Sequence, residues 1–323
     1  MYNVRWVVRG FLEIPDKHFN YDATHAPVAS NSSLLIIISL VVRHDLHFKQ
    51  LDVKTACLNS PLEHRIWVRF SVGYVHPLGH SFAKLRTSLY GLRQAAADWY
   101  ELQHRRLMAF DLARSKADPS LYYKVQDGQF FFVLVHVDYA VAHSDQMHFD
   151  AWLSCFRGLL DTDDYLDIKL IGDVTHLLQM RITRTSGVMT LDQERQIGVL
   201  ATEYGVAECK SVLTPMSAHL DLRKGDDAPM ASIPFRQLVG ALLWIGRHTH
   251  PEIMQPVVYL AQFCTCYGRD HFLAALRILK YLCTVQGRKL TFRGGRDFPL
   301  PGNQTRLTVY SDSDWAMGST DRK

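Results

Sequence analysis

A distinctive pattern of apolar and polar positions lies between residues 130 and 143. Two apolar runs flank one carboxylate, Asp138, with neither Gly nor Pro between them. This predicts a tight β-hairpin of two buried strands with Asp138 at its bend. A second stretch, 47–52, predicts a strand that ends in another single aspartate, Asp52. Either residue alone reads most simply as a solvated turn carboxylate, but two such aspartates side by side in a sheet are a way to hold Mg²⁺ for phosphoryl or nucleotidyl transfer.

Apolar positions at helical spacing predict several helices. Ser32 or Ser33 is expected to cap a core helix that runs through Val42. Near the other end, Leu238, Leu242 and Ile245 follow the i, i+4, i+7 spacing of one helix face. Further helices are expected to end near residue 110 and to span about 147–160, with strands at 4–10, 66–70, 175–184 and 187–191.

The chain divides at one candidate linker. Residues 214–234 contain Gly225, Asp226, Asp227 and three prolines, which are typical of a connection between folded units. We therefore expect a mixed unit at 1–213 and a helical unit at 235–293. A new strand is expected after Gly295, within a segment, 294–323, that is too short to complete a domain.

Composition narrows the class of protein. Hydrophobic residues make up 47% and charged residues 21%, as in ordinary globular proteins and unlike disordered ones. Lys and Arg number 36 against 32 Asp and Glu, which permits a nucleic-acid partner without arguing for one. The six cysteines and 16 histidines show no zinc spacing. The longest apolar run, 34–42, is about half of a membrane span, and no signal peptide opens the chain, so a soluble intracellular protein with reduced thiols is expected.

Six motifs in the same order resemble the reverse transcriptase of Copia-type LTR retrotransposons, over nearly the whole chain. Gln50-Leu-Asp-Val-Lys-Thr-Ala resembles that family's Q-L-D-V-K-T-A-F, and Ser88-Leu-Tyr-Gly-Leu-Arg-Gln-Ala resembles its S-L-Y-G-L-K-Q-A. The other four are 117–122, 239–242, 278–282 and 310–316.

The resemblance implies an α+β fold of fingers, palm and thumb with an antiparallel palm sheet. Fingers and palm would occupy 1–213, the linker 214–234, a helical thumb or connection region 235–293, and the truncated start of a ribonuclease H-like domain 294–323. It also implies an RNA-directed DNA polymerase from a Pol polyprotein, with Mg²⁺ or Mn²⁺ as cofactor and an RNA or DNA primer–template and dNTPs as partners. The location implied is a cytoplasmic particle or the nucleus, with no membrane association.

By position, Asp52 and Asp138 match the metal ligands of the palm. Lys169 matches a lysine that protonates pyrophosphate, although a lone surface lysine is otherwise a solvated charge. Cys57 stands where the family carries an aromatic residue that rejects a ribose 2′-hydroxyl, so weaker sugar discrimination is expected. By the same resemblance, four residues match family residues that bind the incoming nucleotide: Arg5, Tyr90, Gly91 and Gln94. Asp312 matches the first catalytic carboxylate of the ribonuclease H.

The catalytic hairpin departs from the family. Where the family has Y-V-D-D, this chain reads His136-Val137-Asp138-Tyr139. A phenol is not an anionic ligand near neutral pH, so we expect a degenerate polymerase that is weakly active or inactive, unless another carboxylate such as Asp145 takes over. The alternatives are a non-catalytic nucleic-acid-binding protein and a remnant without function. An unrelated phosphotransferase is disfavoured because the chain has no phosphate-binding G-x-x-x-x-G-K-[ST] loop.

Overall fold

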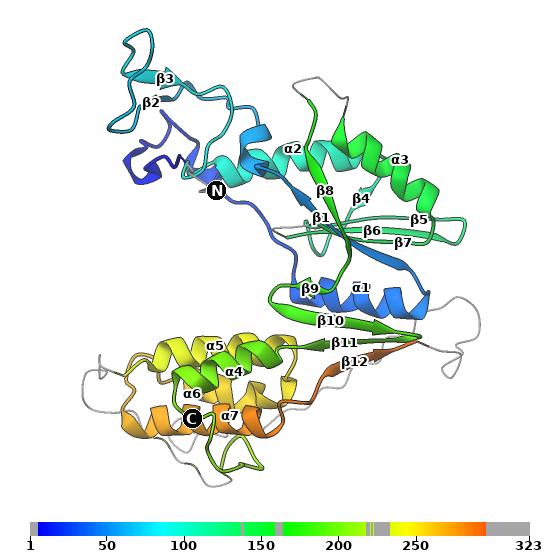
Figure 1. Ribbon diagram of the computed structural model, residues 1–323, viewed down its shortest axis with the longest axis vertical. Coiled ribbons are helices and arrows are strands. Elements are labelled where there is room, and N and C mark those ends of the chain that lie inside the picture. Colours follow the sequence, from blue (N-terminus) through cyan, green and yellow to red (C-terminus); the bar gives the residue numbers. More distant parts are fainter. Residues whose placement is uncertain are drawn as a thin grey trace, which may run out of the picture.

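The computed structural model describes residues 6–136, 139–158, 164–217, 220, 222 and 233–294. Its largest element is an antiparallel sheet, the main sheet, with strand order β4-β5-β6-β7-β1-β8 (Figure 1). The strands are β1 (His47–Val53), β4 (Ala113–Arg114), β5 (Leu121–Gln126), β6 (Gln129–Val135), β7 (Tyr139–His143) and β8 (Ile168–Asp173). The mixed α/β class and the antiparallel sheet expected from the sequence are confirmed.

The predicted hairpin is formed by β6 and β7. Their antiparallel register pairs Val135 with Tyr139, so the bend falls between these two residues. Every residue of β7 is buried, because the strand lies between β6 and β1 and its side chains enter the apolar clusters on both faces of the main sheet. The bend residues Val137 and Asp138 lie outside the described residues.

Different helices pack on the two faces of the main sheet. On one face, helices α2 (Ala95–Ala109) and α3 (Gln146–Arg157) bury an apolar cluster that includes Leu51, Trp152 and Phe156. On the other, helix α1 (Asn31–Arg43) packs its apolar side on a cluster that includes Phe48 and Phe132. Because successive residues of a strand point to opposite faces, β1, β6 and β7 each contribute buried residues to both clusters.

Helix α1 is the predicted core helix, but its cap was wrongly placed. Ser30 is the N-cap, and its hydroxyl accepts a hydrogen bond from the backbone N–H of Ser33. Asp118, before β5, holds this helix end to the main sheet: its carboxylate accepts from the backbone N–H groups of Ser30 and Ser120, at 2.9 and 3.0 Å. Asp118 is only 5% exposed. Its side chain therefore joins the start of α1 to the start of β5, two segments that are distant in sequence.

A second antiparallel sheet has the order β12-β11-β10-β9, with β9 (His176–Leu177), β10 (Met180–Thr185), β11 (Val188–Asp192) and β12 (Leu290–Arg293). The strand expected at 175–184 is thus interrupted, since Leu178 and Gln179 adopt positive φ angles of 51° and 63°. Strand β12 returns from the end of the helical region to pair with β11. Gly294 follows it, where an added Cβ would lie 2.2 Å from the Val42 carbonyl oxygen.

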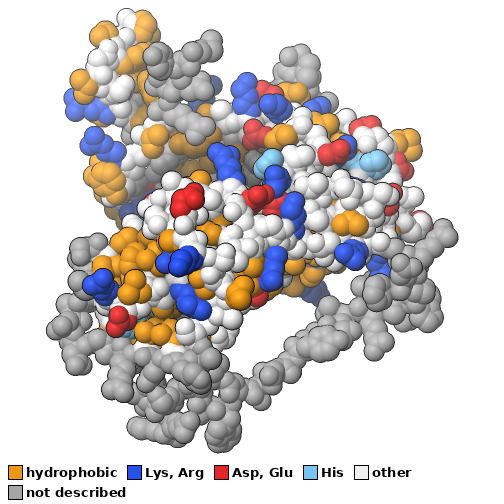
Figure 2. Space-filling view, turned by 60° about the horizontal axis from the view of Figure 1, so that its bottom comes forward, with side chains coloured by type: hydrophobic (Ala, Val, Ile, Leu, Met, Phe, Trp, Pro, Cys, Tyr) orange, Lys and Arg blue, Asp and Glu red, His pale blue; other side chains and the backbone are white. Residues whose placement is uncertain are grey.

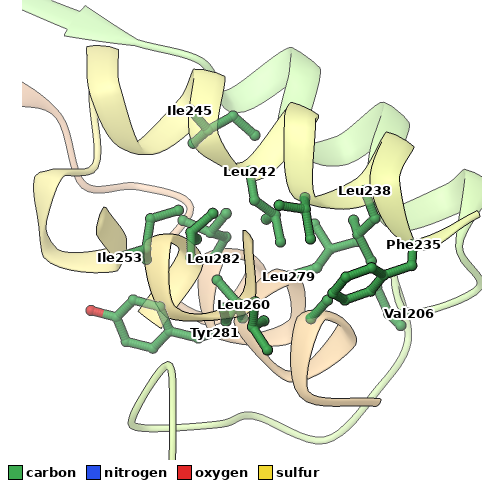
Figure 3. Packing of buried hydrophobic residues seen from close by; sticks show 14 of the residues in the cluster. Val206, Phe235, Leu238, Leu242, Ile245, Ile253, Leu260, Leu279, Tyr281 and Leu282 are labelled. Carbon is green, nitrogen blue, oxygen red and sulfur yellow. The ribbon is translucent and has the colours of Figure 1, made fainter. Parts of the chain in front are cut away.

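Helices α4 (Glu194–Glu203), α5 (Phe235–His248), α6 (Met254–Ala261) and α7 (Arg269–Thr284) form a separate cluster around their own apolar core (Figures 1 and 3). Leu238, Leu242 and Ile245 are buried there, as their spacing predicts. Leu279 of α7 and Phe235 point into the same core in Figure 3. Helix α4 packs here although it precedes residues 214–234, the stretch expected to be the linker.

The N-terminal segment and a two-stranded hairpin complete the described structure. Residues 6–9 are not a strand, contrary to expectation, and a short 3₁₀ helix follows at Gly10–Leu12. The strand predicted at 66–70 is present as β2 (Trp67–Arg69), paired with β3 (Phe82–Lys84). Among the described residues, no helix is long and apolar enough to cross a bilayer. The strand expected after Gly295 lies outside the described residues, as does Asp312.

Candidate active site

Asp52 lies near the end of β1 with its side chain exposed, between the buried residues Leu51 and Val53. Strand alternation places these two neighbours on the face covered by α2 and α3, and Asp52 on the opposite face. The antiparallel register makes Lys169 of β8 its direct cross-strand partner. Directly opposite residues point to the same face, so the structure brings together two of the residues predicted to be catalytic.

The strand that directly follows Asp138 in the chain, β7, lies beside β1. Tyr139, the next residue, lies opposite Leu51, the residue before Asp52. The first residue of β7 in the predicted catalytic hairpin therefore lies beside the end of β1 that carries Asp52.

Tyr139 does not share the exposed face of Asp52. As the cross-strand partner of Leu51 it points to the opposite face, where the residue is only 1% exposed. Its hydroxyl donates a hydrogen bond to Gln103 Oε1 of α2, and its ring lies edge-on to Phe156 with centroids 5.3 Å apart. Burial raises the pKa of this phenol well above its ordinary value. The side chain in the family's second carboxylate position is thus part of the apolar core.

Asp145, considered above as a replacement ligand, has a different role. It is the N-cap of α3, and its carboxylate accepts hydrogen bonds from the backbone N–H groups of Met147 and His148. These bonds satisfy two of the N–H groups that a helix start leaves without a partner. The sequence signal for this role was present, since an Asp directly before an amphipathic stretch is a common cap.

Cys57 lies in the 3₁₀ helix Ala56–Asn59 that directly follows β1. It is half-buried against a small apolar cluster that includes Ile66 and Leu92, and this burial raises the pKa of its thiol. Nearby, the Ser88 hydroxyl donates to the carboxylate of Asp98. Burial also raises the pKa of Asp98 above its ordinary value. Sequence reasoning missed this half-buried acid, which a carboxylate in the first turn of an otherwise Ala-rich helix start could have indicated.

Gly91 has a structural reason to be glycine. Its φ is +95°, and an added Cβ would lie 2.1 Å from the carbonyl oxygen of Val8. Gly10 approaches from the other side, where a Cβ would meet the Gly91 carbonyl oxygen at the same distance. The N-terminal segment therefore crosses the Ser88–Ala95 motif backbone against backbone, and Val8 donates to the carbonyl of Tyr90 at 2.8 Å. Whether Gly91 also admits a nucleotide stays a prediction.

Gln94 takes part in the same crossing. Gln94 is only 4% exposed, and its side-chain Nε2 donates a hydrogen bond to the His18 carbonyl at 3.1 Å. Beside it, Arg93 Nε donates to the carbonyl of Gly10 at 2.9 Å. These bonds hold the N-terminal segment, which follows the undescribed Arg5, onto the start of α2. The nucleotide-binding roles of Arg5, Tyr90 and Gln94 stay predictions.

The exposed carboxylate of Asp52 is the kind of ligand that a hard cation prefers. The carboxylate of Asp52 is exposed, and no ion pair joins it to a described residue. Mg²⁺ binds through one or two carboxylates and substrate phosphates and keeps several waters, so a complete protein cage is not required. Within the described parts of the chain, no group of three or more His, Cys, Asp and Glu side chains forms a metal cluster.

Comparison with known proteins assigns the family. Residues 1–218 match the family model described as reverse transcriptase (RNA-dependent DNA polymerase). The chain belongs to the reverse transcriptase family. The match contains β1 with Asp52, the Ser88–Ala95 motif and the β6–β7 hairpin, so the site described above lies within the family's own domain.

Curated relatives of this reverse transcriptase-family chain include retrovirus-related Pol polyproteins from transposons. The retrovirus-related Pol polyprotein from transposon TNT 1-94 of Nicotiana tabacum is 32% identical over 100% of this chain and 24% of its own length. Those from transposons RE2 and RE1 of Arabidopsis thaliana are each 27% identical over 99% of this chain and 21% of their own length. The Copia-type resemblance is confirmed, and the chain spans about a quarter of these relatives. No solved structure matches the chain.

Proposed function

We propose that this chain is an RNA-directed DNA polymerase of a Copia-type retrotransposon, built as fingers, palm and thumb. The main sheet would be the palm, the β2–β3 hairpin and the N-terminal segment the fingers, and helices α4–α7 the thumb. The observation that carries the proposal is the exposed pair of Asp52 and Lys169 on adjacent strands of the main sheet. A carboxylate and an ammonium group lie on one face there, beside the strand that follows the predicted catalytic hairpin, and this arrangement supports the proposed roles of metal ligand and proton donor.

Asp52, together with Asp138, would hold Mg²⁺ or Mn²⁺. When bound, such ions supply charge neutralisation to the attacking primer 3′-hydroxyl and to the leaving pyrophosphate. Lys169 would donate a proton to the pyrophosphate oxygen, because it lies directly across from Asp52. Arg5, Tyr90 and Gly91 would lie nearest the incoming dNTP, the buried Gln94 would act by holding the N-terminal segment in place, and the sugar would lie over Cys57.

We further propose that catalysis is weak. Two carboxylates rather than three would hold the metal ions, and each lost anionic ligand weakens binding of the hard cation. Tyr139 points into the core, so its side chain neither supplies a ligand on the face of Asp52 nor covers that face.

Primer extension on poly(rA)/oligo(dT), with Mg²⁺ and with Mn²⁺, tests the proposal through Asp52→Asn. Asp167→Asn is the matched control, since this exposed acid pairs with Lys54 at 3.0 Å close by. We expect Asp52→Asn to reduce extension about 100-fold or more, because a metal ligand contributes several kcal/mol and each factor of ten in rate corresponds to about 1.4 kcal/mol. Equal extension by Asp52→Asn and the native chain would refute the assignment of Asp52.

A non-catalytic nucleic-acid-binding role is the second candidate, favoured by Tyr139 in place of a carboxylate. It predicts no extension by the native chain with either metal, together with primer–template binding that weakens steeply as salt rises. Measurable extension by the native chain, lost in Asp52→Asn, would exclude this candidate.

A further inference from the structure

The segment that leads into α1 is bound to the base of the predicted catalytic hairpin. The backbone N–H of Ala29 donates to the carbonyl of Val135, the last residue of β6, at 3.0 Å. The N–H of Val135 donates in turn to the Ser120 carbonyl at 2.9 Å. Ser30, the residue after Ala29, is held by the Asp118 carboxylate. The start of α1 is therefore fixed to the end of β6, beside the bend of the hairpin.

The first residue of α1 extends this contact to the helical cluster, α4–α7. Asn31 Nδ2 donates at 2.9 Å to the carbonyl of Arg247, in the last turn of α5. The last carbonyls of a helix have no partner within the helix, so Asn31 caps α5 from another element. The positive end of the α1 dipole also meets the negative end of the α5 dipole there. Figure 1 shows the start of α1 at the end of that helix nearest the cluster.

The same end of α5 is held by a second element and lies near the hairpin bend. The Thr249 hydroxyl donates to Gln193 Oε1, just before α4, at 2.7 Å. Both residues are buried, at 4% and 2% exposed. Burial lowers the pKa of His248, and the charge of His136 adds to this effect, so His136 lies close to this helix end. His136 is the first residue after β6, where the bend begins.

Local helix formation does not account for an asparagine at position 31. Ser30 already provides the N-cap, and the first helical position favours proline or a good helix former. Asparagine ranks among the weaker helix formers. Its Oδ1 atom is buried, so the side chain points into the contact with α5 and not toward solvent. The bond to α5 therefore gives this side chain a role that the start of α1 does not require.

We propose that Asn31 is a positioning residue that couples the docking of the helical cluster to the geometry of the catalytic hairpin. Because Ala29 is two residues before Asn31, a shift of α5 that carries Asn31 with it also strains the bond to Val135. In the view of Figure 2 the surface continues without a break from the cluster, at the lower left, to the part that contains the sheets. The inference rests on the proposed function only for its consequence, since a displaced hairpin would misplace Asp138.

Hydrogen–deuterium exchange of the whole chain, resolved to single amides and without nucleic acid or metal, tests the proposal. Asn31→Leu removes the donor to α5. We expect exchange about 5-fold faster, the factor for one net hydrogen bond, at the end of α5 and also at Ala29 and Val135. Exchange that is faster at α5 alone would overturn the proposal. A uniform rise that includes β10 and β11 would show a loss of overall stability instead and would also overturn it.

The matched control for this substitution is Asn20→Leu. The Asn20 side chain accepts a hydrogen bond from the N–H of Asp22, within its own turn, so its loss should leave α5 and the hairpin base unchanged. The exchange measurement needs no polymerase activity. A native chain that extends no primer would therefore count against the proposed function, whereas native exchange rates in Asn31→Leu would count against the coupling.

Asn31→Asp tests the donor itself. The aspartate has nearly the shape of asparagine, but when ionised it only accepts hydrogen bonds and cannot bind the α5 carbonyl. Near neutral pH, exchange at the end of α5 should be at least as fast as in Asn31→Leu. As pH falls through about 4 the carboxyl group gains a proton to donate, so protection should recover in Asn31→Asp and not in Asn31→Leu. Equal pH dependence of the two variants would refute the hydrogen bond as the cause.

Thr249→Val tests the coupling from the other direction. It removes the hydroxyl that binds Gln193 and should loosen the end of α5. If α5 and the hairpin are coupled, exchange at Ala29 and Val135 rises as well. The control is Thr202→Val, because the Thr202 hydroxyl donates to the Gly198 carbonyl within α4. Native exchange at the hairpin base in Thr249→Val, with faster exchange at α5, would refute the coupling.

Discussion

Replacing Tyr139 with aspartate would restore the acidic pair of the family's hairpin in sequence, yet we expect the variant to unfold rather than gain activity. The Tyr139 ring is buried against Phe156, and its hydroxyl donates to Gln103. Because Tyr139 is the direct partner of Leu51, an aspartate there would enter the apolar core and not the face of Asp52.

The magnitude follows from what the aspartate leaves behind. Loss of a buried aromatic ring costs about 3–5 kcal/mol, and a buried carboxylate without a partner adds several more. Arg106 is the nearby cation, but its guanidinium already donates to the Phe156 carbonyl at 2.8 Å and pairs with Asp164. The sum exceeds about 5 kcal/mol, comparable with the whole stability of an ordinary domain. Tyr139→Phe removes only the hydroxyl and leaves Gln103 Oε1 without its donor, at a cost of about 1–3 kcal/mol.

Urea denaturation followed by circular dichroism measures both variants against the native chain, and primer extension measures their activity. The expected order of stability is native, then Tyr139→Phe, then Tyr139→Asp, which should be largely unfolded without urea. A folded Tyr139→Asp variant with a native midpoint and raised extension would refute the reasoning. It would mean that position 139 faces the metal site.

Two further predictions concern residues that hold distant segments together. Burial alone would raise the pKa of Asp118, but hydrogen bonds from Ser33, Ser30 and Ser120 outweigh it and lower that pKa. The stability that this carboxylate contributes is therefore present above the pKa of an unfolded aspartate and is lost as pH falls through the lowered value in the fold. Asp118→Ala should cost about 2 kcal/mol at pH 7 and less in acid, whereas Asp150→Ala, at an exposed position within helix α3, should cost little at either pH. Urea midpoints at both pH values decide this, and a cost for Asp118→Ala that is independent of pH would contradict it. Gly91→Ala should destabilise by more than Gly128→Ala in thermal denaturation: both glycines have positive φ, but only Gly91 has backbone within 4 Å of an added Cβ. Equal melting temperatures for these two variants would show that the N-terminal segment does not press on Gly91.

Local periodicity was enough to predict the elements around the site. The strand that carries Asp52, the β6–β7 hairpin and the core of α1 are all patterns of a few residues, in which side-chain direction follows from position along one element. The motif order was likewise readable from the chain, and the family comparison confirmed it. These features depend on interactions between neighbours in sequence, so the sequence contains them directly.

Which residues meet was decided by the tertiary structure. Asp52 faces Lys169 because β1 and β8 are sheet neighbours in one register, and a shift of one residue would turn Asp52 into the core. The same register places Tyr139 inside, although its motif position alone pointed to the metal site. Gly91 is needed for a crossing with Val8, a contact between segments more than eighty residues apart. Alternation along a strand shows which residues share a face, but only strand pairing and the packing of helices on the sheet determine which face meets solvent.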